Sequence, residues 1–231
     1  MKKVPASKEL KDPSHNELDQ PISVEVEQLP EIWRAIEAAV SPELALRRQG
    51  VKKLSGLKAA HGSPLVAYFL ATRIIEPDIG LRIQVVKALA EVLDSEKQPP
   101  YEDGMARRYI SSYLAQMRTR HIFALLETAD EDVKSREDVT SLLKECSYAG
   151  IHMADILSDR DLPVKIRRQA IYFIGRMGFL DAVPALERLA ARLSSKLPLQ
   201  RSLPGMPPET ADEELGLFFP IKDALITLRA P

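Results

Sequence analysis

The sequence contains a single cysteine, Cys146, in 231 residues. One thiol cannot form a disulfide within the chain, and it cannot supply a metal site made of several thiolates. Four histidines are present, and their positions show no metal-ligand spacing: His15, His61, His121 and His152. The sequence therefore predicts no metal site and no cofactor. Cys146 itself occupies an apolar helix position and is expected to be a core residue.

Aromatic residues are scarce, at 6%, and neither sign of charge is in excess, with 32 Lys and Arg against 33 Asp and Glu. Nucleic-acid-binding proteins usually carry a basic excess, because counterion release from phosphates supplies much of their affinity. Long apolar runs are also lacking. No stretch approaches the roughly 18 apolar residues that a membrane-spanning helix needs, and no apolar run follows the basic N-terminus as in a secretory signal. We therefore expect a cytoplasmic protein without a membrane partner.

Motifs of catalysis are absent as well. The sequence has no glycine-rich phosphate loop and no Gly-x-Ser-x-Gly nucleophile motif. Neighbouring acids such as Glu213 and Glu214 suit the start of a helix, and nothing in the sequence places two carboxylates across a cleft. The sequence predicts no catalytic residue, and we expect the protein not to be an enzyme.

What the sequence does contain is an internal repeat. Apolar or small residues recur at offsets of 0, 4, 8 and 11, a spacing that keeps one stripe of a helix facing inward. The six copies begin at Leu46, Leu81, Ala106, Ser135, Ile166 and Leu217. Shorter apolar helices are predicted between them, at residues 29–40, 63–75, 121–128, 151–158 and 181–193. No short helix fits between the second and third copies, so the stacking is expected to shift there.

A second column of the repeat is arginine. An arginine follows the opening position of the first five copies, at intervals of 35, 25, 29 and 31 residues: Arg47, Arg82, Arg107, Arg136 and Arg167. An acid precedes four of these arginines by four residues: Glu43, Asp78, Asp103 and Asp132. An acid at a helix start caps free N–H groups, and at a spacing of four it can also pair with the arginine. We interpret this column as a structural ladder.

Prolines divide the chain. Residues 1–28 are polar and contain Pro5, Pro13 and Pro21, which predicts a flexible tail with a short extended piece at 22–26. Four prolines in residues 194–210 predict a loop, because proline interrupts a helix. The remainder, residues 29–231, is expected to form one all-α domain. The loop is either a plain insertion or a segment that docks into a partner.

Residues 161–193 resemble a HEAT-like repeat of the short kind first noted in phycobilin lyases. The segment has an acid, the pair Ile166-Arg167, a glycine turn at Gly178 and then Ala-Val-Pro-Ala-Leu at 182–186. The resemblance covers about residues 29–228, although the other copies lack the Pro-Ala-Leu signature. It implies an α-solenoid of about five to six stacked antiparallel helix pairs. It also implies the family's usual role of holding protein partners, while some members are bilin lyases or DNA glycosylases.

Two features are candidates for partner binding. A second basic residue follows the arginine column and, with one lysine, makes a possible binding stripe for an acidic partner: Arg48, Lys52, Arg108 and Arg168. The alternative is an ordinary solvated face. The single tryptophan, Trp33, either covers the open end of the array or anchors an interface.

Three functions follow from these features. The first is a non-catalytic adaptor or assembly subunit that binds another protein on the concave face of the solenoid. The second is a solenoid that binds the backbone of a nucleic acid through the arginine pairs. The third is a HEAT-like enzyme, a bilin lyase or a DNA glycosylase. A glycosylase is expected to place aromatic residues and an acid in its groove, and one tryptophan near the end of the array does not provide them.

Overall fold

The computed structural model describes residues 22–56, 63–94, 105–201 and 213–230, with side chains from residue 29 and without those of 197–201. These residues form helices and no strand, which confirms the all-α prediction. The α-helices are α1 (Ile22–Ala39), α2 (Leu44–Gly56), α4 (Pro64–Thr72), α5 (Ile79–Leu93), α6 (Met105–Ala115), α7 (Thr119–Glu131), α8 (Arg136–Lys144), α9 (Ala149–Ser158), α10 (Val164–Met177), α11 (Val183–Arg201) and α12 (Phe218–Arg229). Four 3₁₀-helices join them: η1 (Arg73–Ile75), η3 (Val133–Ser135), η4 (Leu180–Ala182) and η6 (Glu213–Leu217).

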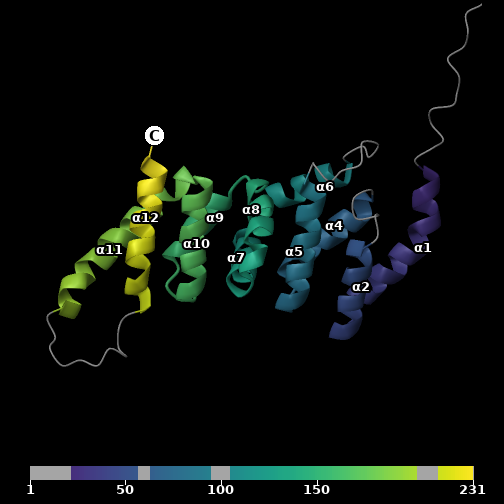
Figure 1. Cartoon of the computed structure of the whole chain (residues 1–231), viewed down its shortest axis with the longest axis horizontal. Helices are drawn as coiled ribbons and strands as arrows, with labels where there is room; N and C mark the ends of the chain where they lie inside the picture. Colours follow the sequence, from purple (N-terminus) through teal and green to yellow (C-terminus); the bar gives the residue numbers. More distant parts are fainter. Residues whose placement is uncertain (1–21, 57–62, 95–104, 202–212, 231) are drawn as a thin grey trace, which may run out of the picture.

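The helices stand in an elongated row that follows the order of the chain, from α1 and α2 at one end to α11 and α12 at the other (Figure 1). Within the row, α2 packs against α5, α5 against α8, and α10 against α12. On the second layer α7 packs against α9, and α9 packs against α11. Each helix thus buries its apolar stripe against near neighbours in the sequence.

The repeated apolar column forms the core of this row. In the second to sixth copies the residues at offsets 0, 4 and 8 are all buried, as Leu81, Val85 and Leu89 illustrate. The prediction that this column faces inward is therefore confirmed for these copies. In the first copy Gly50 and Leu54 are buried, but Leu46 is 41% exposed. Leu46 lies in the first turn of α2, at the end of the row, where fewer helices are present to cover it.

Capping residues set several helix boundaries. The carboxylate of Asp78 accepts a hydrogen bond from the backbone N–H of Leu81 at 2.8 Å, which satisfies a free donor at the start of α5. Gly178 ends α10 with a φ of 75°, a left-handed conformation that glycine adopts without a steric penalty. The sequence predicted both positions from residue type.

Two predicted boundaries are wrong. Helix α1 begins at Ile22, so residues 22–28 are helical rather than part of a tail or an extended piece. The alternation at 22–26 is short and its glutamates are good helix formers, so without a partner strand the helix prevails. Helix α11 continues to Arg201, so the predicted loop does not begin at 194. Proline in the last turns of a helix removes only one hydrogen bond. The rest of the predicted tail and loop, residues 1–21 and 202–212, lies outside the described residues.

The third copy occupies an unexpected place. Helix α6 packs against α4, whereas α5 packs directly against α8. The α6 column of Ala106, Ile110 and Leu114 is buried as predicted, but it faces α4 and α5 rather than continuing the row of long helices. The predicted shift in stacking between the second and third copies is thereby confirmed. Among the helices that the structure describes, α4 and α5 are those that pack extensively against α6.

Candidate partner-binding surface

Arginines of the column contact residues further along the chain instead of pairing with the acid four residues before them. The Nε of Arg47 donates to the Glu76 carboxylate at 3.0 Å, and the Nη1 of Arg82 donates to Glu127 at 2.6 Å. Arg82 also donates to the backbone carbonyls of Glu76 and Ala124. The predicted pairing of each arginine with the acid four residues before it is thus wrong for these two arginines. Their side chains are only slightly exposed, so their guanidinium groups lie against the following pair.

Arg136 and Arg167 also contact residues that lie later in the chain. The guanidinium of Arg136 on α8 lies over the ring of Tyr172 on α10, 5.0 Å from the ring centroid. Arg167 on α10 contacts Glu214 of η6 at 2.8 Å, with its side chain only 2% exposed. Arg107, on the displaced α6, lines a depression together with Glu137 and Asp138 of α8. Four of the five arginines therefore contact a residue that comes 29 or more positions later in the chain.

The acids of the repeat act mainly as caps. Asp132 accepts hydrogen bonds from the Ser135 hydroxyl at 2.7 Å and from the Lys134 N–H at 3.1 Å. The Ser135 hydrogen bond is the main reason that the pKa of Asp132 lies below its ordinary value. Glu43 is exposed, and Arg47 donates to the carbonyls of Ser41 and Pro42 instead. Asp103 lies outside the described residues. The capping prediction holds for Asp78 and Asp132.

The candidate stripe residues belong to three helices that do not form one row. Arg48 on α2 forms an ion pair with Asp78 at 3.0 Å, so it too joins neighbouring units. Lys52 is exposed on α2, and Arg108 is exposed on α6, outside the row of α2, α5 and α8. Arg168 is exposed on α10 beside Gly216 and lines a shallow depression with Tyr172 and Arg176. The structure therefore does not bring the four side chains together on a single helix row.

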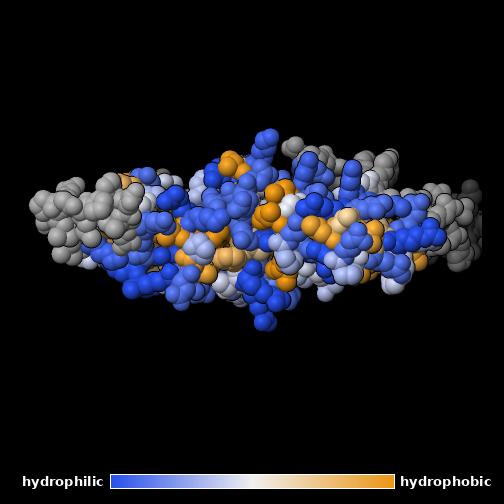
Figure 2. Space-filling model, turned by 90° about the horizontal axis from the view of Figure 1, so that it is seen from below, coloured by the Kyte–Doolittle hydropathy of each residue, from blue (hydrophilic) through white to orange (hydrophobic). Residues whose placement is uncertain are grey.

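Trp33 is 58% exposed on α1, so its ring is not buried within the array. On the face shown in Figure 2, hydrophobic residues lie in scattered groups separated by hydrophilic ones. That face offers no broad continuous apolar patch. A partner site is therefore better sought where exposed aromatic side chains gather around a depression.

Such a depression lies where α6 leaves the row. We call it the tyrosine hollow; it has a volume of about 560 Å³ and is lined by Tyr68, Tyr109, Ser112, Tyr113, Gln116, Met117, Arg118, Arg120 and His121. Tyr68 comes from α4 and Tyr109 from α6, and they are 51% and 52% exposed. The ring of Tyr113 stands edge-on to that of Tyr68, with centroids 5.7 Å apart, and edge-on to His121 at 6.1 Å. No acidic residue is among the nine that line this hollow.

Sequence reasoning missed the tyrosine hollow. Tyr109 and Tyr113 are four residues apart and so share a face of α6, which is a visible signal. Tyr68 joins them only because α6 packs against α4, and no spacing in the sequence shows that contact. The hollow thus depends on the displaced helix rather than on the repeat.

Burial sets the protonation state of the histidine at the rim of the hollow. His121 is 6% exposed, and its Nδ1 accepts a hydrogen bond from the backbone N–H of Arg118 at 3.2 Å. Burial lowers the pKa of His121, and the positive charges of Arg120 and Arg118 and the neighbouring His152 lower it further. The neutral ring is therefore favoured, with Nδ1 free to cap the first turn of α7.

A pH dependence follows from this cap. Because the pKa of His121 is depressed in the folded state, the unfolded chain takes up the proton first as the pH falls below about 6.5. We expect this histidine to lower the Tm between pH 7.5 and 5.5. A His121→Gln variant keeps a capping acceptor at the third helical position but does not titrate. Its Tm should fall less over that range, as measured by circular dichroism. Equal pH dependence of the two proteins would contradict this role.

The described residues give less support to a nucleophilic cysteine, a metal site or a membrane-spanning helix. Cys146 is 5% exposed and burial raises the pKa of its thiol, as expected of a core cysteine rather than a nucleophile. Within the ranges that the structure describes, no group of three or more His, Cys, Asp or Glu residues is arranged to hold a metal ion. In the same ranges no helix is long and apolar enough to cross a bilayer. His152 pairs with the hydroxyl of Thr119 at 3.0 Å, and His15 and His61 lie outside the described residues.

No family model, no curated protein and no solved structure matches the chain.

Proposed function

We propose that the chain is a HEAT-like α-solenoid that serves as a non-catalytic scaffold for a protein partner. Five helix pairs, α1–α2, α4–α5, α7–α8, α9–α10 and α11–α12, with α6 as an extra helix, fit such an array. The buried repeat column and the arginines that contact the following unit support this proposal. Stacked repeats of this kind present extended surfaces, which suits them to binding other proteins.

The tyrosine hollow is the observation that carries the proposal. Tyrosine, methionine and arginine are enriched in protein interfaces, and tyrosine and arginine are common among the residues that dominate binding energy. The hollow brings together three tyrosines and two arginines over the buried Met117, and two of the tyrosines expose half of their surface. A tyrosine has few rotatable bonds, so ordering its ring against a partner costs little conformational entropy.

The positive charge at the rim of the hollow indicates which kind of partner segment would bind there. Arg118 and Arg120 are exposed at the rim, and the lining contains no carboxylate to neutralise them. A segment that presents an acidic side chain beside an apolar one would pair with the arginines and pack on the rings. Charge complementarity thus favours an acidic, partly apolar segment of another protein.

Binding measurements with matched variants test the proposal. The wild-type protein, immobilised and exposed to native extract, should retain a partner that the Tyr68→Ala/Tyr109→Ala variant loses. With that partner purified, each alanine substitution should weaken binding by about tenfold or more. Tyr148→Ala is the control, because Tyr148 is 57% exposed but lies outside the hollow. Equal binding of the partner to wild type, to the double tyrosine variant and to Tyr148→Ala would show that the hollow is not the binding site.

Single-stranded nucleic acid is the second candidate, because exposed tyrosines beside arginines can also stack bases and attract phosphates. This candidate predicts binding of a labelled oligonucleotide that weakens steeply with added salt. The Arg118→Gln/Arg120→Gln variant should then lose most of that binding. If the oligonucleotide does not bind at low salt, the protein-partner proposal stands alone.

A further inference from the structure

Three arginines line a small cavity at the far end of the row from the tyrosine hollow. The cavity has a volume of about 190 Å³ and is lined by residues from the end of α9 and from α11. Its apolar floor includes Leu157 and Leu189. Its polar lining consists of Arg160, Arg188 and Arg192, with Ser158. Acidic residues are absent from the lining.

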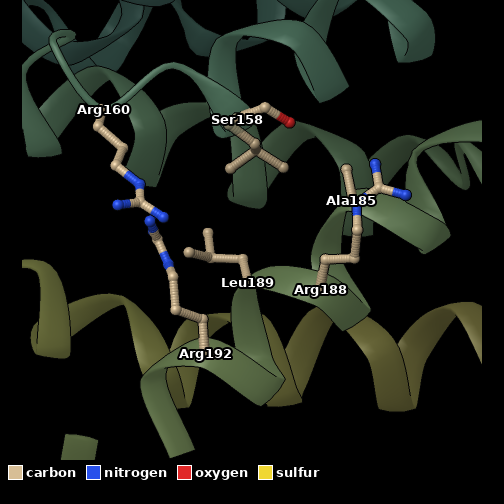
Figure 3. Close-up of a pocket in the computed structure, with 7 residues that line it drawn as sticks. Ser158, Arg160, Ala185, Arg188, Leu189 and Arg192 are labelled. Atoms are coloured by element: carbon tan, nitrogen blue, oxygen red, sulfur yellow. The ribbon is translucent and has the colours of Figure 1, made fainter.

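The fold explains why these side chains meet. Arg188 and Arg192 are four residues apart on α11 and therefore share one face of that helix. Arg160 follows the last turn of α9, which packs against α11. Figure 3 shows the guanidinium groups of Arg160 and Arg192 pointing toward one another across the cavity, with Arg188 beside Ala185.

The positive charge of the cavity is only partly neutralised. Arg192 contacts Glu214 at 2.5 Å, but that carboxylate also contacts Arg167 and Lys196. One acid thus serves three cations. Arg160 and Arg188 form no hydrogen bond or ion pair with any other residue that the structure describes. Asp159 and Asp161 flank Arg160 in the chain, but they hydrogen-bond each other and do not line the cavity.

Like charges that face each other above an apolar floor favour an anion between them. Because the floor keeps water from one side, the attraction of an anion for the guanidinium groups is stronger than in bulk water. Each guanidinium can donate two parallel hydrogen bonds to a carboxylate or a phosphate. Arg160 and Arg192 face each other, and Arg188 lies at the other side of the cavity (Figure 3). A phosphate monoester, with three terminal oxygens and a nearly double charge, can accept from the facing pair and still offer an oxygen to Arg188, which the two oxygens of a carboxylate cannot do as well.

We propose that Arg160, Arg188 and Arg192 form a binding site for a phosphate group, either free inorganic phosphate or a phosphate monoester. The site is separate from the tyrosine hollow and does not rest on the proposed scaffold function. The carbonyl groups at the end of α9 offer the opposing explanation, since the negative end of a helix also attracts arginines. In that case the three side chains would need no ligand.

Titration with inorganic phosphate and with a phosphoserine peptide, followed by calorimetry at low ionic strength, tests the site. We expect saturable binding at one site per chain, and at least a tenfold loss of affinity in Arg160→Gln and in Arg188→Gln. Arg34→Gln is the control, because Arg34 is exposed on α1 at the opposite end of the row. Circular dichroism of each variant shows that the fold is intact.

The two ligands separate the possible sources. Tighter binding of the phosphoserine peptide than of inorganic phosphate identifies a phosphorylated partner, and similar affinities identify free phosphate; the unphosphorylated peptide should not bind. No saturable binding of either ligand would overturn the site. Equal affinity of wild type, Arg160→Gln and Arg188→Gln would overturn it as well. A result against the phosphate site would not change the loss of partner binding expected in the tyrosine variants. The two proposals can therefore fail independently.

Discussion

Replacement of Glu214 by alanine is expected to lower the free energy of unfolding by about 3–5 kcal/mol, because it leaves a buried cation without its partner. The side chain of Arg167 is 2% exposed and contacts Glu214 at 2.8 Å. Arg192 and Lys196 contact the same carboxylate. One substitution would therefore remove the acid that links α10, α11 and η6. Urea denaturation followed by circular dichroism measures the loss.

The matched control is Glu187→Ala. Glu187 forms an ion pair with Arg229, but both side chains are about half exposed or more, so the variant should lose no more than about 1 kcal/mol. A Glu214→Ala variant as stable as Glu187→Ala would show that the buried contact contributes little. It would also weaken the interpretation of the arginine column as the link between units.

The contribution of Glu214 should also depend on pH. Burial raises its pKa, but hydrogen bonding and charge from Arg167, with Arg192 and Lys196, outweigh burial and lower it overall. A carboxylate with a depressed folded-state pKa stabilises the fold above its ordinary pKa and loses that contribution as the pH falls. The difference in stability between wild type and Glu214→Ala should therefore shrink in acid.

The second large effect is expected at Gly50, where α1 and α2 approach most closely. A Cβ at this position would lie 2.4 Å from the backbone N of Ala39 and 2.6 Å from the carbonyl O of Ala35. Backbone atoms cannot rotate away as a side chain can, so Gly50→Ala must push α1 off α2. We expect a net loss of about 2 kcal/mol, since overpacking costs more than alanine's helix propensity returns.

Gly56→Ala provides the opposite result in the same helix. A Cβ at Gly56 meets no atom within 4 Å, but Gly56 is the last residue of α2, so the substitution should raise stability only slightly, by up to about 0.5 kcal/mol. Thermal unfolding of the two variants compares them directly, and hydrogen exchange reports whether α1 has loosened. A Gly50→Ala protein with wild-type stability and unchanged protection of α1 would contradict the close approach.

The sequence predicted the apolar core better than the contacts of the charged residues. Residues such as Val85, Val139 and Ala170 were assigned to the core by periodicity alone, because burying one helical stripe requires a fixed spacing. The partners of Arg82 and Arg167 were not predictable in the same way. Glu127 and Glu214 lie more than forty residues away from them, and no local rule selects an acid at that distance.

The candidate site was harder to predict than the fold. The proline-containing segment before α6 indicated a change in stacking, but not that α6 would pack against α4. Tyr68 and Tyr109 become neighbours of one hollow through that contact alone. The arginine cavity was missed for a similar reason. Arg188 and Arg192 share a helix face, whereas Arg160 comes from the turn that follows α9.

Because arginines of the repeat column contact residues later in the chain, each arginine is synthesised before its partner. Arg47 finds its carboxylate 29 residues later, and Arg82 finds its own 45 residues later. On a ribosome that adds about 5–20 residues per second, each arginine waits several seconds for its acceptor to emerge. A nascent chain that stalls between either arginine and its glutamate would therefore leave that cation without its carboxylate.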